Sequence, residues 1–516
     1  MKWTDGRLSI AIIGGGAAAV CLLDALAQAS DLRGRVVVVE PSRKLWRGRP
    51  YQEDIHSVRV NIPPKGMSVR HGDTNHFSRW LADRSRNTLS DAIAEYDDPY
   101  CGVPFVPRTV YGEYLQQCAW EAITALRRRG LEVEIVRDTV ETILRDDHRT
   151  MLWTRGGLTV DVDHAVLCIG RGAPPDNYRL DGAMGFVRDP YPLTTSLESI
   201  DPSADLAILG SGLTAMDVVL ALAARDHRGR IRLLSRHGVL PAVRQRPVSY
   251  ALQHFTADRF RAAAADGVSL TTKELVALMR AELIDAGEEP DAVAETVCTL
   301  QETDPVDRLR RELAAVDSKS IGLRILQQAV PETGPDVWPL ITAREKTLLL
   351  RRYYRTAMSL CCPMPPSTAG TLLSLIDSGQ LEVVSGVRSV KASGKGFAVE
   401  AGSRTYQAHA VVNAVNSSVS DIPSTAEPLV ASLVGARLAQ RHAHGGLAVE
   451  RATSRLVHNR EAVPGLFALG DLASGSLFFT FGLPSLVDRA HDIAEHITQG
   501  FHSRFQTKQP HFLQRI

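Results

Sequence analysis

The hydrophobic pattern of the chain contains two apolar segments that are each followed by a glycine-rich turn and then by helical spacing. The first segment covers 8–13 and leads into Gly14–Ala19, and the second covers 205–209 and leads into Gly210–Ala215. A short buried strand that turns directly into a helix is typical of the first half of a parallel βαβ unit. The pattern therefore predicts an α/β fold with two Rossmann-like domains.

Helical periodicity dominates the middle of the chain, from about 245 to 370, where apolar residues recur at i, i+3 and i+4. Four helices are expected in this helical block, at 256–264, 272–286, 290–301 and 304–315. The block interrupts the second strand-and-helix unit. Such an insertion serves either as a cover over a substrate or as a structural or dimerisation element, and the pattern leaves both open.

Strand-like segments complete the expected organisation. A small antiparallel meander is expected at 131–136, 140–144 and 150–153, and further strands at 381–384, 387–391 and 397–400. A proline-containing linker covers 190–202. We expect three parts, in which 1–196 begins one nucleotide-binding domain, 203–405 forms a second with the helical block, and 406–516 completes the first.

Composition and charge restrict the class of protein. The chain has 516 residues, 23% charged residues and a net charge of +1, so no global field attracts nucleic acid. No apolar run reaches the roughly 20 residues that span a bilayer, and the N-terminal segment lacks a signal-peptide pattern. These features predict a cytoplasmic protein that binds neither nucleic acid nor membrane, and they allow a homo-oligomer.

The cysteines and clustered histidines show no pattern of a disulfide framework or a metal site. None of the seven cysteines has Cys-x-x-Cys spacing, and the adjacent Cys361 and Cys362 are interpreted as thiols in the core or beside a loop. His56, His71 and His76 match no ligand spacing. We expect no bound metal, and the missing dithiol argues against a disulfide reductase.

The first glycine-rich turn has the chemistry of a dinucleotide-phosphate loop. Gly14, Gly16 and Ala19 fit the pattern GxGxxA, which combines a tight turn, close approach of a pyrophosphate and close packing of helix on strand. The next strand ends at Glu40, about 21 residues beyond Ala19, where a carboxylate binds ribose hydroxyls. The spacing predicts a bound dinucleotide.

The second turn repeats this pattern, at Gly210, Gly212, Thr214 and Ala215. Its next strand ends in Ser235 and Arg236 rather than in an acid. A carboxylate would repel a 2′-phosphate, whereas a hydroxyl and a guanidinium bind one through charge-assisted hydrogen bonds. The difference predicts NADPH rather than NADH at the second turn.

Two strand ends elsewhere are suited to complete a flavin site. The buried run 165–172 contains Gly170, and the strand at 465–471 delivers Gly470 and Asp471 to a loop. A helix begins near Ser485. A carboxylate at such a position can hydrogen-bond the ribityl chain of FAD while the helix N-terminus faces the flavin. These segments predict FAD in the first domain.

With these motifs the chain resembles the two-dinucleotide-binding-domain FAD/NAD(P) flavoproteins, and among them the bacterial flavin-dependent N-hydroxylating monooxygenases of amines and amino acids. Besides the two turns, three segments carry the resemblance, at 46–51, 60–68 and 107–115. The resemblance implies FAD at the first turn and NADPH at the second. It further implies that the reduced flavin forms a hydroperoxide with O₂ and hydroxylates the nitrogen of a small amine or amino-acid-like metabolite, in specialised metabolism.

The resemblance also implies roles for individual side chains. The candidate catalytic residues near the flavin or substrate are Asn61, Lys65 and Arg108. The further candidates for cofactor contacts are Trp46, Tyr51, Met67 and the backbone of Val140. Tyr111 and Tyr114 either face the flavin or substrate, or pack on a helix face.

The chain departs from the family's pattern at two places. Asn416 stands where related proteins end a strand with glycine, and 358–366 is apolar where they often carry histidine and arginine. These departures concern the substrate more than the cofactors. Two other functions therefore stay open, an NADPH-dependent flavin oxidoreductase or dehydrogenase without oxygen insertion, and a nucleotide-binding redox sensor or scaffold.

Overall fold

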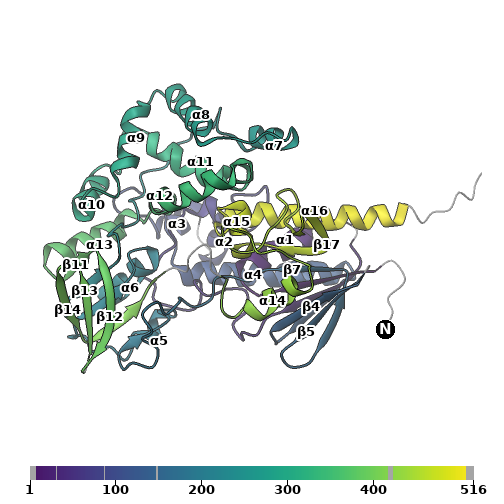
Figure 1. Cartoon of the computed structure of the whole chain (residues 1–516), viewed down its shortest axis with the longest axis horizontal. Helices are drawn as coiled ribbons and strands as arrows, with labels where there is room; N and C mark the ends of the chain where they lie inside the picture. The colour runs from purple at the N-terminus through teal and green to yellow at the C-terminus, as the bar shows by residue number, and fades with distance from the viewer. Residues whose placement is uncertain are drawn as a thin grey trace, which may run out of the picture.

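Two sheets of mainly parallel strands form the frame of the molecule (Figure 1). The computed structural model describes residues 7–30, 32–85, 88–146, 149–394, 396–415 and 422–506. The first sheet has the order β16 (Arg455–His458), β17 (Glu461–Ala468), β7 (His164–Leu167), β1 (Leu8–Ile13), β2 (Gly34–Val39) and β3 (Glu132–Val136). The second sheet has the order β11 (Leu381–Val384), β10 (Ile231–Leu234), β9 (Leu206–Leu209), β15 (Ala410–Asn413) and β8 (Phe186–Val187).

Alternating burial explains how the first sheet is covered. Successive residues of a strand point to opposite faces, so Ile10 and Ile12 pack on one side of β1 while Ala11 and Ile13 pack on the other. The first side is covered by the helices α1 (Ala17–Gln28), α4 (Arg108–Arg128) and α16 (Leu483–Gln506). The other side is covered by an antiparallel sheet of β4 (Val140–Arg145), β5 (Thr150–Thr154) and β6 (Thr159–Val162), together with α14 (Glu427–Gly435).

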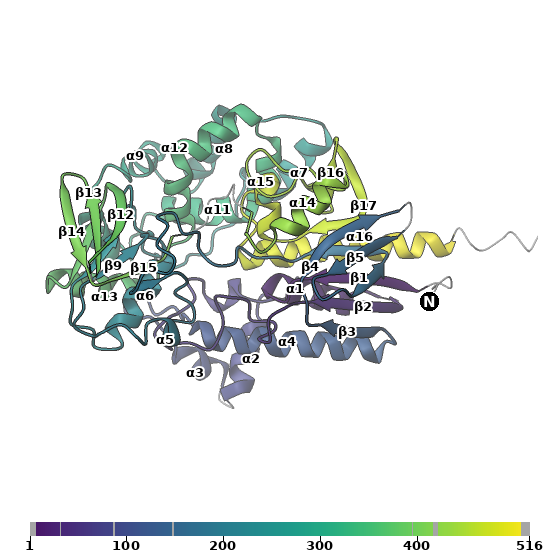
Figure 2. The same cartoon turned by 60° about the horizontal axis from the view of Figure 1, so that its bottom comes forward.

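The second sheet is built on the same plan. One side is covered mainly by α6 (Leu213–Ala223) and α13 (Pro366–Asp377), and the other by an antiparallel sheet of β12 (Val387–Ser393), β13 (Gly396–Ala401) and β14 (Arg404–Ala408). Figure 2 shows the two antiparallel sheets at opposite ends of the molecule, with β12–β14 on the left and β4 and β5 on the right. The predicted α/β fold with two Rossmann-like domains is confirmed, and each domain carries its own meander.

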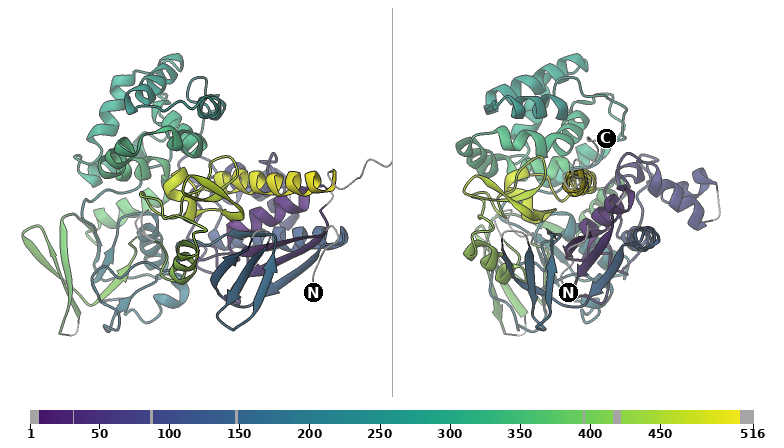
Figure 3. Two further views of the ribbon diagram at one scale, coloured as in Figure 1. Left: turned by 45° about the vertical axis from the view of Figure 1, so that its right-hand side comes forward. Right: turned by 90° about the vertical axis from the view of Figure 1, so that its right-hand side faces the viewer.

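The helical block lies beside the C-terminal part of the chain, as both views of Figure 3 show. It comprises α7 (Ala257–Ala265), α8 (Thr272–Asp285), α9 (Pro290–Thr299), α10 (Pro305–Ala314), α11 (Gly322–Val337), η2 (Trp338–Leu340) and α12 (Ala343–Cys361). The four expected helices are present because each has a start signal, a side-chain cap at Thr256, Thr271 and Asp304 or a first-turn proline at Pro290. α11 packs on α15 (Ser474–Leu477) and α16, so the block touches the first domain.

Short elements connect these layers, namely η1 (Pro64–Gly66), α2 (His76–Ser85), α3 (Leu89–Ala94), α5 (Leu193–Ser196) and η3 (Asp471–Ala473). Within the described ranges, no helix combines the length and the apolar character that crossing a bilayer requires.

The structure corrects two details of the expected organisation. The segment 131–136 is not part of the meander, because α4 carries the chain back across the sheet and β3 then pairs in parallel with β2. Strands β8 and β15 belong to the second sheet, where β15 pairs with both β8 and β9. The second sheet therefore includes a strand before the boundary expected at 196 and a strand after the boundary expected at 406.

Candidate functional site

The first glycine-rich turn has the backbone geometry of a phosphate-binding loop. Gly14 has a φ of +111°, and a Cβ added there would lie 2.4 Å from the carbonyl oxygen of Cys168, just beyond β7. The Gly14 N–H donates to the carbonyl of Val39 at 2.9 Å, so the turn is held between the ends of β2 and β7. α1 has Gly16 as its N-cap and no side-chain cap, which leaves its first N–H groups for a ligand.

The second turn reproduces this geometry. Gly210 has a φ of +117°, and an added Cβ would lie 2.5 Å from the carbonyl oxygen of Ala414, just beyond β15. The Gly210 N–H donates to the carbonyl of Leu234 at 2.8 Å, and α6 has Gly212 as its N-cap, again without a side-chain cap. The other predicted residues of the turns lie in the first turns of α1 and α6, namely Ala19, Thr214 and Ala215. The repeated sequence motif is thus a repeated structure.

The two turns differ in the charge that lies beside them. Glu40 follows β2, and its carboxylate accepts the N–H of Gly15 in the first turn at 2.7 Å. At the corresponding place after β10, the Ser235 hydroxyl accepts the N–H of Gly238 at 2.8 Å. The Arg236 side chain is exposed there and forms no ion pair within the described ranges. The first turn is therefore bordered by a carboxylate and the second by a guanidinium.

Gly470 and Ser485 lie where the first and last helices of the first domain converge. Gly470 has a φ of +93°, and an added Cβ would lie 3.4 Å from Leu486 of α16 and 4.0 Å from Ala18 of α1. The Ser485 hydroxyl is buried and has no hydrogen-bond partner among the described residues. A buried polar group without a partner costs free energy, so the Ser485 hydroxyl is suited to bind a polar group of a ligand. The space beside Gly470 thus fits the polar groups of FAD between the N-termini of α1 and α16.

Asp471 belongs to a polar cluster that connects the first domain with the helical block. Arg171 Nε donates to Asp471 Oδ1 at 2.8 Å, and the Arg171 guanidinium lies 5.2 Å from the ring centre of Phe481. Tyr354 of α12 lies near Arg171 and contributes to raising its pKa. A Cβ on Gly170 would lie 3.8 Å from Asp471 Oδ2. Gly170 and Asp471 are both predicted site residues, whereas Arg171, which directly follows Gly170, and Tyr354 were not predicted from the sequence.

Asn61 lies where the first domain meets the second domain and the helical block. Its Nδ2 donates to the carbonyl of Pro363 at 3.3 Å, and its own carbonyl accepts Arg244 Nε at 2.8 Å. Desolvation lowers the pKa of Arg244 to about 10. Of the neighbouring candidates, Lys65 is exposed on η1, whereas Met67 is buried in the core of the first domain.

Arg108 forms an ion pair between the two domains. Its Nη2 lies 2.8 Å from Asp217 Oδ2, its Nη1 donates to the Tyr191 hydroxyl at 3.0 Å, and its Nε donates to the carbonyl of Arg59 at 3.2 Å. Tyr191 also donates to Asp217. Burial raises the pKa of Asp217 to about 6, and Arg108 and Tyr191 act in the opposite direction. Arg108 therefore links α4 to α6.

Within the described ranges, no hydrogen bond or ion pair joins Asn61, Lys65 and Arg108 to one another. Sequence reasoning missed Asp217 as the partner of Arg108. The available signal was a carboxylate within an otherwise apolar helical run.

The segment 46–51 packs between the first turn and α4. The Trp46 N–H donates to the carbonyl of Gly15 at 2.7 Å, and the Trp46 indole is buried against Trp120. A Cβ on Gly112 would lie 1.9 Å from the carbonyl oxygen of Tyr51, so α4 approaches this segment only because residue 112 is glycine. Trp46 and Tyr51 thus shape the first turn through backbone contacts and packing.

Tyr114 holds the loop that follows the Asn61 segment, and its loss tests this role. The buried Tyr114 hydroxyl accepts the N–H of Val69 at 3.1 Å and lies 2.8 Å from His76 Nδ1. Tyr114→Phe leaves the Val69 N–H without an acceptor, so we expect a loss of about 1–3 kcal/mol, visible as a lower thermal unfolding midpoint. Tyr111→Phe is the matched control, because the Tyr111 hydroxyl is equally buried but has no partner among the described residues. Equal losses in both variants would contradict this assignment.

Both tyrosines lie in the core between α1, α2 and α4, which agrees with the packing interpretation of Tyr111 and Tyr114. Val140 is buried at the start of β4, where the pairing with β5 shifts register. Asn416 lies outside the described residues.

Cys361 and Cys362 end α12 beside Arg244 and are both free thiols. Burial raises the pKa of Cys361 well above its ordinary value and that of Cys362 to about 12. Both groups are therefore protonated at neutral pH, which makes them poor nucleophiles. The pair is interpreted as structural.

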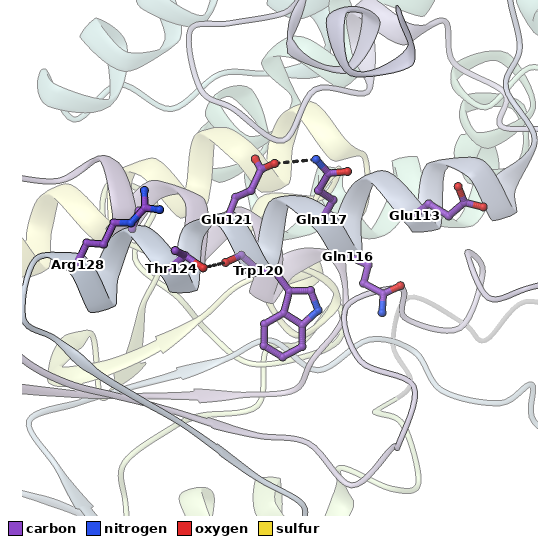
Figure 4. A pocket seen from close by; sticks show the side chains of 8 residues that line it. Glu113, Gln116, Gln117, Trp120, Glu121, Thr124 and Arg128 are labelled. Carbon is purple, nitrogen blue, oxygen red and sulfur yellow. Dashed lines mark hydrogen bonds between the residues drawn. The ribbon is translucent and has the colours of Figure 1, made fainter. Parts of the chain in front are cut away.

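A shallow hollow on the outer face of α4 is separate from this site (Figure 4). It is lined only by side chains of that helix, between Glu113 and Arg128, and contains none of the predicted site residues. Gln117 donates to Glu121, and Thr124 donates to the carbonyl of Trp120, both at 2.8 Å. These polar groups are paired along the helix itself.

Comparisons with known proteins agree with this geometry. Residues 11–172 match the family model described as FAD-NAD(P)-binding. No curated protein matches the chain by sequence.

Solved structures resemble the chain over nearly its whole length. The ornithine N-hydroxylase of Kutzneria sp. 744 is 14% identical, with a TM-score of 0.57 and coverage of 96% of this chain and 99% of that chain. L-lysine 6-monooxygenase from Pseudomonas syringae is 16% identical, with a TM-score of 0.57 and the same coverages. The cadaverine monooxygenase DfoA of Erwinia amylovora is 15% identical, with a TM-score of 0.59 and coverage of 95% and 94%. The chain therefore contains an FAD-NAD(P)-binding domain and has the fold of these hydroxylases and monooxygenases.

Proposed function

We propose that the protein is an FAD-dependent, NADPH-consuming monooxygenase that uses O₂ to hydroxylate the nitrogen of a small amine or amino-acid-like metabolite. The observation that carries this proposal is the pair of matched turns, with the carboxylate of Glu40 beside the first and Ser235 and Arg236 beside the second. A carboxylate suits free ribose hydroxyls, and a guanidinium suits a 2′-phosphate. This difference favours FAD in the first domain and NADPH in the second.

The solved structures of the same fold support the kind of reaction. The Kutzneria enzyme was solved with reduced FAD, NADP⁺ and L-ornithine, and the Erwinia enzyme with FAD. Ornithine, lysine and cadaverine all carry a primary amino group at the end of an aliphatic chain. An aliphatic amine is therefore the substrate class that we propose.

The side chains at the junction of the two domains suit an amine substrate. Bound FAD would supply hydride uptake and activation of O₂, which protein side chains do not provide. The chain's own contribution is to hold the two nucleotides and to place Arg171 and Arg244 where the first domain meets the helical block and the second domain. Positive charge lowers the pKa of a neighbouring amine and so favours the neutral nitrogen that can be hydroxylated. The same guanidiniums can bind a substrate carboxylate.

The assay for this function follows the consumption of NADPH and the formation of two products. Purified protein with bound flavin is mixed in air with NADPH and L-ornithine, L-lysine or cadaverine, and consumed NADPH, hydrogen peroxide and hydroxylated amine are quantified. We expect an aliphatic amine to gain one oxygen atom, with a matching fall in hydrogen peroxide per NADPH. Hydrogen peroxide equal to NADPH with every amine would instead support an oxidoreductase without oxygen insertion, and protein without flavin would support a scaffold.

Arg236→Ala tests whether the second turn binds NADPH in preference to NADH. Removing a guanidinium from a phosphate should raise KM for NADPH about tenfold or more and leave KM for NADH nearly unchanged. Arg230→Ala is the matched control, because Arg230 is also exposed but precedes β10 at the opposite end of that strand. An equal effect of Arg236→Ala on both nucleotides would refute the 2′-phosphate assignment.

A further inference from the structure

A cluster of positive charge at the end of β10 includes a residue from the helical block. Arg236 and His237 follow the strand, and Arg355 lies on α12. The Arg355 Nε is buried and has no hydrogen-bond partner among the described residues. Neither Arg236 nor Arg355 forms an ion pair within those ranges. The two guanidiniums of this cluster therefore have no carboxylate partner among the described residues.

Two hydrogen bonds fix α12 against the segment that follows these residues. The Ser359 hydroxyl donates to the carbonyl of Leu240 at 2.7 Å, and the Ala242 N–H donates to the carbonyl of Ser359 at 3.0 Å. Arg355 precedes Ser359 by one helical turn and lies on the same face of α12. The anchor thus brings Arg355 to the chain segment that begins at Arg236.

The electrostatics agree with this placement. Burial and the nearby Arg236 lower the pKa of Arg355, and burial, Arg355 and Arg236 together lower the pKa of His237. Two neighbouring positive charges disfavour each other's charged form, and an anion bound between them would offset this effect. A phosphate group supplies that charge together with several acceptor oxygens.

We propose that Arg355 is a second ligand of the 2′-phosphate of NADPH, supplied by the helical block opposite Arg236. The inference rests on the proposed function, because it requires NADPH at the second turn. It gives the block a role in cofactor selection, since part of the phosphate site comes from α12 and part from the Rossmann-like domain. The same helix carries Tyr354 to Arg171 and leads to Pro363, which accepts from Asn61. One helix therefore connects the 2′-phosphate site to the candidate flavin site.

The test measures binding of two probes that differ only in this phosphate. Adenosine 2′,5′-bisphosphate and 5′-AMP are titrated by calorimetry into the full-length FAD-loaded protein. We expect Arg355→Ala to weaken binding of the bisphosphate about tenfold or more. The affinity for 5′-AMP and the FAD content should stay unchanged. Arg355→Lys, which keeps the charge, should retain part of the affinity. Arg344→Ala, at the exposed first turn of the same helix, should change the affinity for neither probe.

The outcomes separate this inference from the proposed function. If Arg236→Ala weakens binding of the bisphosphate and Arg355→Ala does not, the assignment of Arg355 as a phosphate ligand is wrong. The assignment of NADPH to the second turn then stands. If Arg355→Ala weakens binding of both probes equally, the residue has only a structural role and the inference is overturned. If the wild-type protein binds both probes with equal affinity, the NADPH assignment itself fails, and the inference fails with it.

Discussion

Gly14→Ala is expected to give a protein that purifies with little FAD. The added Cβ would lie 2.4 Å from the backbone oxygen of Cys168, and a φ of +111° is strained for any residue with a Cβ. The Cys168 N–H donates to the carbonyl of Ile13, so the obstructing backbone is itself held by β1. The turn must therefore open and lose its N–H groups as phosphate ligands. FAD per protein, read from visible absorbance, should fall about tenfold or more.

Gly130→Ala is the control that separates the clash from backbone strain. Gly130 has a φ of +87°, but nothing lies within 4 Å of an added Cβ. Only a strain of roughly 1–2 kcal/mol then remains, and this variant should keep its FAD. Gly14→Ala protein that binds FAD as tightly as wild type would contradict the first turn as the FAD site.

Arg108→Met is expected to destabilise the protein by about 3 kcal/mol or more near pH 8, because it leaves the Asp217 carboxylate buried without its counter-charge. The Arg108 and Asp217 side chains are only 13% and 6% exposed. The loss should appear as a lower unfolding midpoint of the FAD-loaded protein. Since the pair links α4 to α6, reduction of the flavin by NADPH should also slow.

The pH dependence of this loss has a defined sign. Burial raises the pKa of Asp217 from 3.8 to about 6 in the presence of Arg108, and removing Arg108 raises it further. A carboxyl whose pKa is higher in the folded state adds stability at low pH and loses that contribution as pH rises through its folded pKa. The penalty of Arg108→Met should therefore be smaller at pH 5 than at pH 8.

Two further variants serve as controls for the stability loss of Arg108→Met. Asp217→Asn in the Arg108→Met background should recover part of the stability, because it removes the unpaired carboxylate. Arg188→Met breaks the exposed pair with Asp181 and should cost no more than about 1 kcal/mol. If Arg108→Met protein is as stable as wild type at both pH values and only turnover falls, the link between domains is wrong and a catalytic role of Arg108 is favoured.

Features set by local chain chemistry were predictable from the sequence. Both glycine-rich turns, their following helices and the contrast between Glu40 and Arg236 depend on residues close together in the chain. The helices of the block were predictable for the same reason, since caps at Thr271 and Asp304 mark their starts. Local steric and hydrogen-bonding requirements determine these elements whatever the rest of the chain does.

Features set by distant partners were not predictable. The strand at 131–136 was expected, but its parallel pairing with β2 depends on how α4 crosses the sheet. Arg171 and Asp471 are separated by 300 positions and meet because β7 and β17 are neighbours. Arg355 is brought toward the segment that follows β10 only by the packing of α12, whose Ser359 donates to the carbonyl of Leu240. A single sequence carries no signal for such contacts, because they arise from the three-dimensional arrangement.

The most direct test of this account is the reduction of the bound flavin by NADPH in the absence of oxygen. The protein should carry FAD, and its visible absorption should bleach completely with NADPH and much more slowly with NADH. This result is expected because the first turn holds FAD and the second turn, with Arg236, holds a nucleotide with a 2′-phosphate. A bound flavin that dithionite reduces but NADPH does not would contradict the account.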